Sequence, residues 1–232
     1  MNHNLFESRR NMLRKLAAAG VLGAGGIAGL VRDLLAAGNI TPGVTKIRGN
    51  VLINGKPAVI GMPVVAGDRI VTGADSEVIF VINEDAFLQR AQSAVNFNLS
   101  PADFFRVLSG RLLSVFGKGQ PRKLTTATAT IGIRGTGCYI EAEDAQTYFC
   151  LCYGKAELSP IADPSQAREY WTRQHDSPFF VYPKPGAEAV IPAPYINHTN
   201  EELIMLEGLV GRWPTFYAPK PPPPPPTDPY GY

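Results

Sequence analysis

The chain has 232 residues, of which 45% are hydrophobic and 18% are charged, and its formal net charge at pH 7 is +2. Five basic residues and only two acidic ones fall within residues 1–37, so the rest of the chain carries a net charge of about −1. This excludes the basic stripe of nucleic-acid-binding proteins, and we expect no nucleic-acid partner. The length suits one domain with an appendage.

Residues 1–38 have the layout of a twin-arginine export signal. Arg9 and Arg10 precede a weakly apolar, Ala/Gly-rich run that extends from Leu16 to Leu30. A stable membrane-spanning helix needs about 20 predominantly apolar residues, whereas this run is rich in glycine and ends at Arg32 and Asp33. The sequence therefore predicts a periplasmic protein. The alternative is an inner-membrane anchor formed by residues 16–37, so that an uncleaved signal would be the only membrane contact.

Short β-branched runs separated by turn residues follow the signal. The runs cover residues 44–53, 58–65, 69–72 and 78–82, and glycine, proline, asparagine and aspartate stand between them. This spacing is typical of an all-β domain. Ser100, Pro101 and Asp103 then form a capping pattern that predicts a short helix ending at Gly110.

Residues 125–137 predict a strand followed by a corner. Thr and Ala alternate from Thr125 to Thr130, and Ile131 and Ile133 continue the period of two. Three glycines within six positions then surround Arg134 and Thr136, as expected where the backbone bends sharply. The Arg134-Gly135-Thr136 corner is the candidate binding site, because arginine offers a fork of donors to carboxylate or phosphate groups; a structural clamp for the corner's own carbonyls is the alternative.

Four sequence elements occur in order between residues 66 and 136. They are Ala66–Gly73, Ser76–Val81, Leu108–Leu112 and Thr126–Thr136. This ordered set resembles the FecR domain of periplasmic iron-citrate sensor proteins over roughly residues 44–158. The chain departs from that pattern at Glu84-Asp85-Ala86, where the family usually has an Asp-Gly turn.

The resemblance implies a mainly β fold, either a FecR-like β-solenoid or a sandwich-like sheet stack. It also implies a binding or sensing module rather than an enzyme, with an envelope protein or a small ligand as partner and a role in envelope signalling. Only about 15 residues precede the apolar run, too few for the cytoplasmic sigma-regulating domain that the family relay requires. We therefore expect a module without that domain.

All three cysteines lie in the hairpin that follows the corner. Cys150 and Cys152 are two residues apart in a strand and so share one face, while Cys138 lies on the preceding strand. A turn around Asp144 would place Cys138 opposite Cys150, and a turn around Ala145 would place it opposite Cys152. The sequence thus predicts three clustered sulfurs, either as a cross-strand disulfide with a leftover thiol or as buried thiols.

A metal site is the competing hypothesis for these cysteines. Cys138, Cys150 and Cys152 could be joined by His175 or His198. The Cys-x-Cys spacing differs from the usual zinc knuckle and nothing in the sequence places a histidine near the hairpin, so no metal site is favoured and no cofactor is expected. A redox or metal-binding protein centred on this hairpin is the alternative function. No catalytic motif accompanies either histidine, and we predict no enzyme.

The C-terminal extension, residues 159–218, contains a predicted amphipathic helix near residues 199–211. Thr199 and Glu202 form a capping box, and Leu203, Leu206 and Leu209 follow at helical spacing. Residues 219–232 contain six consecutive prolines and predict an extended polyproline tail. The tail could act as a spacer or as a docking strip for a partner.

Overall fold

The computed structural model describes residues 42–100, 103–119, 121–185 and 189–217, which include a 14-stranded sheet and one α-helix. The mainly β fold is confirmed, and it is sandwich-like. The predicted export signal and polyproline tail lie outside the described residues. The strands are β1 (Gly43–Arg48), β2 (Val51–Ile53), β3 (Lys56–Pro57), β4 (Arg69–Thr72), β5 (Glu77–Ile82), β6 (Asp85–Gln89), β7 (Ala94–Ser100), β8 (Asp103–Val115), β9 (Arg122–Thr125), β10 (Ala129–Ala142), β11 (Thr147–Pro160), β12 (Arg168–Thr172), β13 (Pro178–Val181) and β14 (Val190–Pro192), and the helix is α3 (Asn200–Leu209).

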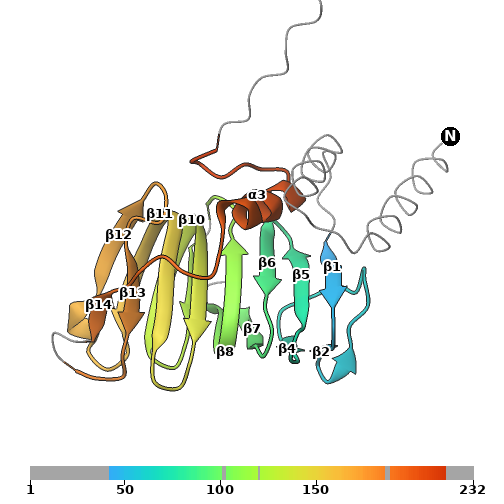
Figure 1. The fold of residues 1–232 in the computed structure, drawn as a ribbon, viewed down its shortest axis with the longest axis horizontal. Helices are drawn as coiled ribbons and strands as arrows, with labels where there is room; N and C mark the ends of the chain where they lie inside the picture. The colour runs from blue at the N-terminus through green and yellow to red at the C-terminus, as the bar shows by residue number, and fades with distance from the viewer. Residues whose placement is uncertain (1–41, 101–102, 120, 186–188, 218–232) are drawn as a thin grey trace, which may run out of the picture.

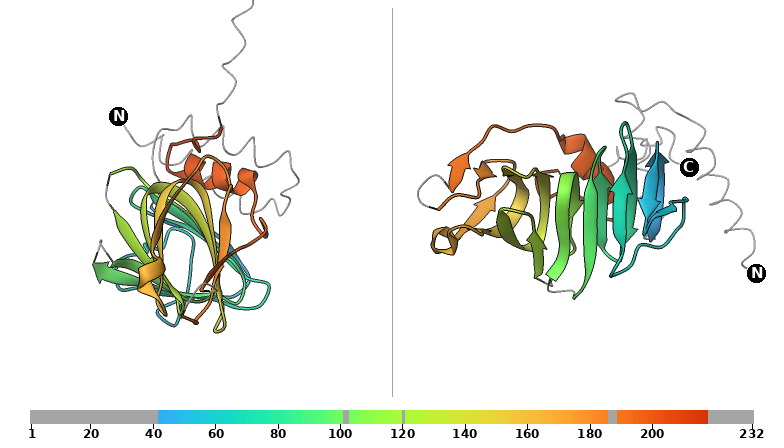
Figure 2. Two further views of the ribbon diagram at one scale, coloured as in Figure 1. Left: turned by 90° about the vertical axis from the view of Figure 1, so that its left-hand side faces the viewer. Right: turned by 90° about the horizontal axis from the view of Figure 1, so that it is seen from below.

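The sheet forms two walls that share three long strands. The first wall has the order β1-β5-β6-β8-β10-β11-β13-β14, and the second has the order β3-β2-β4-β7-β8-β9-β10-β11-β12. Strands β8, β10 and β11 belong to both, because one half of each pairs in the first wall and the other half in the second. Viewed along the row of strands, the two walls enclose the interior (Figure 2).

Glycines mark the points where the long strands pass from one wall to the other. Gly110 in β8 has φ +82°, Gly135 in β10 has φ +60° and Gly154 in β11 has φ +95°. These conformations favour glycine, because a Cβ atom would clash in the left-handed region. The pairing of β10 with β11 also shifts register between Arg134 and Gly137. The corner predicted around Arg134 is therefore a bend within a continuous 14-residue strand.

The space between the walls is filled by aliphatic and aromatic side chains from both. Phe87 lies within this space, and the centroid of its ring is 5.0 Å from that of Phe80 and 5.4 Å from that of Phe97. Leu112 and Phe149 reach the same interior from the first wall, while Leu124 and Ile131 reach it from the second. Burial of this apolar surface is the main contribution to the stability of the sandwich.

Helix α3 covers the outer face of the first wall, above β6 and β8 (Figure 1). Its predicted capping box is confirmed: the Thr199 hydroxyl accepts from the Glu202 amide, and the Glu202 carboxylate accepts from the Thr199 amide. Leu203 and Leu206 are fully buried in a second apolar cluster, which includes Leu88 from β6 and Leu113 from β8. The helix thus completes a core on a sheet face that would otherwise be exposed.

Two local predictions are wrong. The capping pattern at Ser100 does not start a helix, because β7 ends at Ser100 and β8 runs from Asp103 through Gly110 to Val115. Cross-strand pairing with β7 outweighs the local preference there. The run at 58–65 is not a strand either; most of it is turns and irregular structure between β3 and β4.

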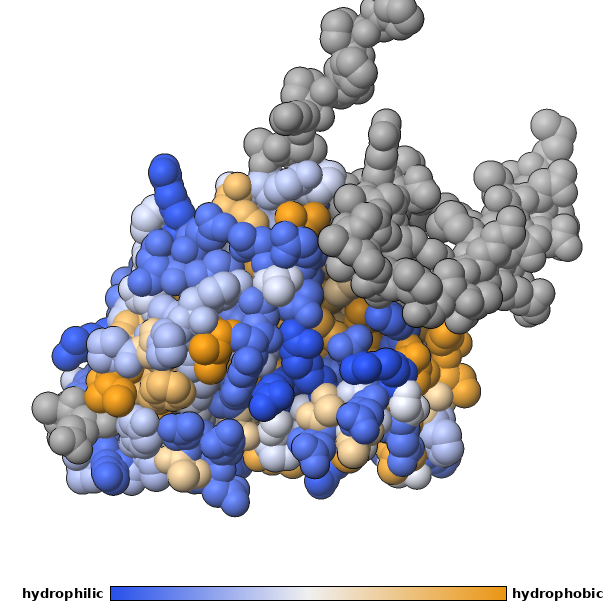
Figure 3. Space-filling model, viewed as in Figure 1, coloured by the Kyte–Doolittle hydropathy of each residue, from blue (hydrophilic) through white to orange (hydrophobic). Residues whose placement is uncertain are grey.

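Residues after 158 continue the sheet. Strand β11 runs to Pro160, β12 pairs with its second half, and β13 and β14 extend the first wall. The face in Figure 3 is largely hydrophilic, with apolar residues towards the two ends of the row of strands. Within the described part of the chain, no helix has the length and apolarity needed to cross a bilayer.

Candidate metal centre

Four side chains of the types that bind metal ions converge beneath the N-terminal end of α3. The ligand atoms of Cys150, Cys152, His175 and His198 all lie within 4.8 Å of one another. Both thiols and His198 are buried, and His175 is half-buried. Two thiolates and two imidazoles form a donor set that zinc uses in structural sites.

Three separate segments supply these four groups. Cys150 and Cys152 are two residues apart on β11, so both thiols point to the same face of the strand, which is the outer face of the first wall. His175 lies in the loop between β12 and β13 and has φ +51°, and its amide donates to the Cys152 carbonyl at 3.0 Å. His198 directly precedes the N-cap of α3. The site therefore joins the sheet, a loop and the C-terminal helix.

Three of the six separations between the ligand atoms match a tetrahedron around zinc. Typical Zn–N and Zn–S bonds place two nitrogens about 3.3 Å apart and a nitrogen and a sulfur about 3.6 Å apart when the angles are tetrahedral. The observed distances are 3.2 Å between His198 Nε2 and His175 Nδ1, 3.5 Å between Cys150 Sγ and His175 Nδ1, and 3.4 Å between Cys152 Sγ and His198 Nε2. The other three pairs of ligand atoms lie within 4.8 Å of each other, so side-chain adjustment would complete the site around an ion.

Hydrogen bonds on the far side of each imidazole set its tautomer. His198 Nδ1 is 2.7 Å from the Ile196 carbonyl, which can only accept, so this nitrogen carries the proton. His175 Nε2 is 3.0 Å from the Asn200 side-chain oxygen and donates to it in the same way. Each ring nitrogen that faces the thiols therefore has a lone pair, free to accept a thiol proton or to bind a metal ion. Such outer hydrogen bonds are typical of metal-ligating histidines.

The two thiols have different acidities. Hydrogen bonding from Cys152 lowers the pKa of Cys150 to about 4 against the opposing effect of burial. Burial raises the pKa of Cys152 well above its usual value, and the neighbouring Cys150 adds to this effect. Metal ions bind thiolates, so Cys150 provides a ready ligand, whereas Cys152 must lose its proton when an ion binds.

Aromatic rings enclose the cluster. The Tyr139 ring stacks on His198 with centroids 4.4 Å apart, and the Tyr195 ring lies 4.4 Å from His175 and 4.7 Å from His198. The Tyr195 hydroxyl also donates to the His198 carbonyl at 2.6 Å. Four protein ligands within such a shell resemble a closed structural zinc site, whereas a catalytic site keeps one position open for water or substrate.

Cys138 does not belong to the cluster, and the predicted gathering of three sulfurs is wrong. It pairs with Leu151 and lies in the core between the walls, whereas Cys150 and Cys152 lie on the opposite face of the sheet. Both sequence-based registers centred the turn on one residue. The actual turn has two central residues, Asp144 and Ala145, which shifts every partner by one position and reverses the face. All three cysteines are free thiols.

The predicted binding corner is separate from this donor set. Arg134 is exposed, and its Nε lies 3.5 Å from the Gly119 carbonyl, while the Thr136 side chain is buried. Gly119 lies in the loop between β8 and β9, so this contact is not with one of the corner's own carbonyls. Whether the corner binds a ligand stays a prediction.

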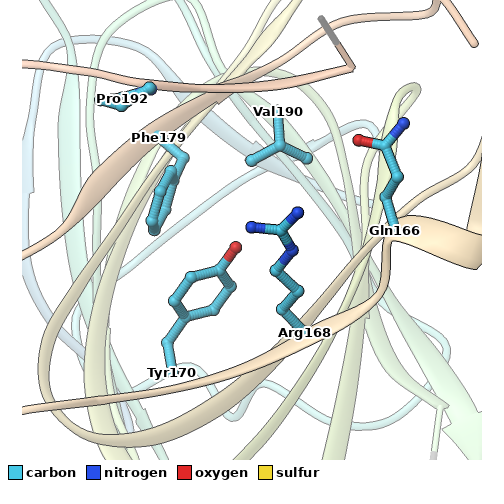
Figure 4. Close-up of a pocket in the computed structure, with 6 residues that line it drawn as sticks. All are labelled: Gln166, Arg168, Tyr170, Phe179, Val190 and Pro192. Carbon is cyan, nitrogen blue, oxygen red and sulfur yellow. The ribbon is translucent and has the colours of Figure 1, made fainter. Parts of the chain in front are cut away.

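A pocket of about 430 Å³ lies at the end of the sheet formed by β12–β14 (Figure 4). The rings of Tyr170 and Phe179 and the side chain of Val190 line it, and the Arg168 guanidinium reaches in beside Tyr170. None of the four metal-binding side chains contributes to it.

No protein-family model matches the chain. No curated protein matches its sequence. Two similar solved structures are described as a "putative anti-sigma factor from Parabacteroides distasonis ATCC 8503"; they are 12% and 13% identical to this chain, with TM-scores of 0.45 and 0.44. Each match covers 54% of this chain and 58% of the other, so the chain spans little more than half the length of those proteins. A likeness at this level carries no information on function.

Both histidines were candidate ligands in the sequence analysis, but no sequence pattern predicted that they lie near the cysteine hairpin. His175 reaches it because β12 and β13 both pair with β11, which places their connecting loop over the cysteines. His198 reaches it because α3 packs on the outer face of the same wall. The detectable signal was the shared face of Cys150 and Cys152 together with a histidine next to a helix N-cap.

Proposed function

We propose that this domain binds one zinc-like transition-metal ion through Cys150, Cys152, His175 and His198. The observation that carries the proposal is the agreement of three ligand separations with a tetrahedral site, with a lone pair on each facing ring nitrogen. Soft sulfur ligands combined with imidazole in tetrahedral geometry favour zinc over calcium, magnesium or manganese. The ion would be bound and retained, not used for catalysis, because the protein provides all four ligands.

We further propose that this metal centre belongs to an exported, FecR-like binding or sensing module in the cell envelope. Arg9 and Arg10 ahead of an apolar run support export, and the ordered elements between residues 66 and 136 support the FecR likeness. The partner would be an envelope protein or a small ligand. Metal coordination would also protect Cys150 and Cys152 from oxidation in an oxidising compartment.

Zinc titration in competition with a chromophoric chelator tests the metal site. The metal-free protein should take up one ion per chain, and Cys152→Ala or His198→Ala should abolish tight uptake. Cys138→Ala is the matched control, because Cys138 is equally buried but lies on the other face of the sheet. Equal loss in Cys138→Ala, or full uptake by Cys152→Ala, would overturn the assignment. Circular dichroism establishes that each variant keeps its sheet.

A further inference from the structure

The segment that carries α3 is attached to the sheet almost entirely through side chains. After β14, Ala193 makes one backbone hydrogen bond to Pro178. From residue 194 to residue 217, the backbone–backbone hydrogen bonds in the described structure are all made within the segment itself, and the bonds to the sheet involve a side chain on at least one side. This segment can therefore leave the sheet without breaking any strand pairing.

Two of the four metal ligands depend on the position of α3. His198 provides its Nε2 directly and is the residue before the helix N-cap. Asn200, the first residue of the helix, holds the ring of His175 through its side-chain oxygen. Movement of the helix away from the sheet would remove one ligand and release the orientation of a second, while both cysteines would stay in place on β11.

Other contacts hold α3 without metal, both at its first turn and further along the helix. Leu203 and Leu206 are fully buried against the wall, Arg90 pairs with Glu202 at 2.7 Å, and the Arg212 guanidinium donates to the Glu84 carbonyl at 2.7 Å. The helix therefore docks in the metal-free protein. Its N-terminal end lies at the candidate metal centre, where Asn200 contacts His175. An ion would add a connection at that end only.

From this arrangement, and on the basis of the metal site proposed above, we infer that the bound ion clamps α3 to the outer face of the sheet. Metal binding and helix docking are then thermodynamically coupled, because the complete ligand set exists only when the helix is docked. The coupling is reciprocal: zinc suppresses opening of the helix, and opening of the helix releases zinc. Chelation in turn increases exposure of the apolar face beneath α3, which contains Leu88, Leu113 and Val115.

The expected effect follows from mass action. When free zinc exceeds the dissociation constant by 100-fold and the open state binds weakly, the open population falls about 100-fold. Amide hydrogen exchange measures this directly, because amides of α3 exchange through local opening. Amides of Leu203, Leu206 and Leu209 should exchange about 100-fold more slowly with zinc than with chelator. Amides of β5, which is remote from the ligands in the sheet order, should change little in comparison.

Zinc uptake and hydrogen exchange on the same full-length sample separate the two proposals. Uptake of one ion with slower exchange in α3 supports the clamp, and the effect should disappear in Cys152→Ala. Uptake of one ion with unchanged exchange in α3 would overturn the clamp and leave the metal site intact. Absence of zinc uptake would overturn the proposed function itself, and the clamp with it.

Discussion

The Nε2 of His175 lies 3.0 Å from the side-chain oxygen of Asn200, so the first residue of α3 orients a ligand that belongs to a different loop. This hydrogen bond places the proton of His175 on the far side of the ring and leaves Nδ1 available to the cysteines. The contact connects the helix to the candidate metal centre without being part of the ligand set.

Replacement of Asn200 should weaken zinc binding without removing a ligand. Loss of an outer hydrogen bond to a metal-ligating histidine typically lowers metal affinity by about 10- to 100-fold, and we expect Asn200→Ala to fall in that range in a chelator competition assay. Asn200→Asp retains an acceptor and should restore most of the affinity. Glu201→Ala, at the next and exposed helix position, serves as the control. Equal affinities in Asn200→Ala and the native protein would show that the hydrogen bond does not orient His175.

Cobalt substitution should reveal the donor set. Co²⁺ bound by two thiolates and two imidazoles in a tetrahedral site gives intense visible bands and a thiolate-to-cobalt charge-transfer band in the near ultraviolet. The charge-transfer band should weaken in Cys150→Ala and stay unchanged in Cys138→Ala, because the Cys150 thiol faces the histidines and the Cys138 thiol does not. Weak bands typical of octahedral cobalt would contradict the tetrahedral site. Absorption spectra during a Co²⁺ titration provide the measurement.

The class of fold and the C-terminal helix were predictable because their signals are local. Short β-branched runs with turn residues between them indicated the sheet, and Thr199 with Glu202 indicated where the helix begins. The capping pattern at Ser100 was equally local but misleading, since pairing between β7 and β8 decides the conformation there. A local pattern cannot reveal which tertiary contact will override it.

The candidate metal centre was only half predictable. The shared face of Cys150 and Cys152 follows from strand alternation alone. The exclusion of Cys138 depends on whether the turn after β10 has an even or odd number of central residues, which the sequence left undecided. The histidines lie near the cysteines because of two long-range contacts: β12 and β13 pair with β11, and α3 packs on the sheet. The spacing of residues in the sequence does not predict either contact.

Gly110 should be among the least replaceable residues of the sheet. Its φ is +82°, and an added Cβ would lie 2.5 Å from the Ser93 Cα and 2.7 Å from the Gln92 carbonyl oxygen, both backbone atoms that cannot rotate away. Gly110→Ala should lower the free energy of unfolding by more than about 3 kcal/mol, through clash and strain together.

Gly55→Ala is the matched control for Gly110→Ala. Gly55 has φ +76° but no atom within 4 Å of an added Cβ, so only backbone strain of about 1–2 kcal/mol remains. Urea denaturation of both variants measures the difference. Similar costs at the two positions would mean that β7 and β8 can separate at the bend to accommodate a side chain.

The Glu202 carboxylate has two roles, and two substitutions can separate them. It accepts from the Thr199 amide in the capping box, and it accepts two hydrogen bonds, at 2.7 and 2.9 Å, from Arg90 Nη2. Glu202→Gln keeps one acceptor oxygen that can serve both Thr199 and Arg90, but it removes the charge and replaces the second acceptor by an NH2 donor, so we expect a loss of about 1 kcal/mol in unfolding free energy. Glu202→Ala removes both interactions and leaves a largely buried guanidinium without its main partner, so we expect a loss of about 2–3 kcal/mol.

Thr199→Ala provides the reference for the Glu202 variants, because it removes the N-cap side chain and leaves Arg90 paired with Glu202. A lost N-cap typically costs about 1 kcal/mol, so Glu202→Ala should be clearly less stable than Thr199→Ala in urea denaturation. Similar stabilities would show that the Arg90 pair contributes little beyond capping. The pair links β6 and its following turn to the first turn of α3, beside the metal ligands. Glu202→Ala should therefore also speed hydrogen exchange in α3 more than in β5.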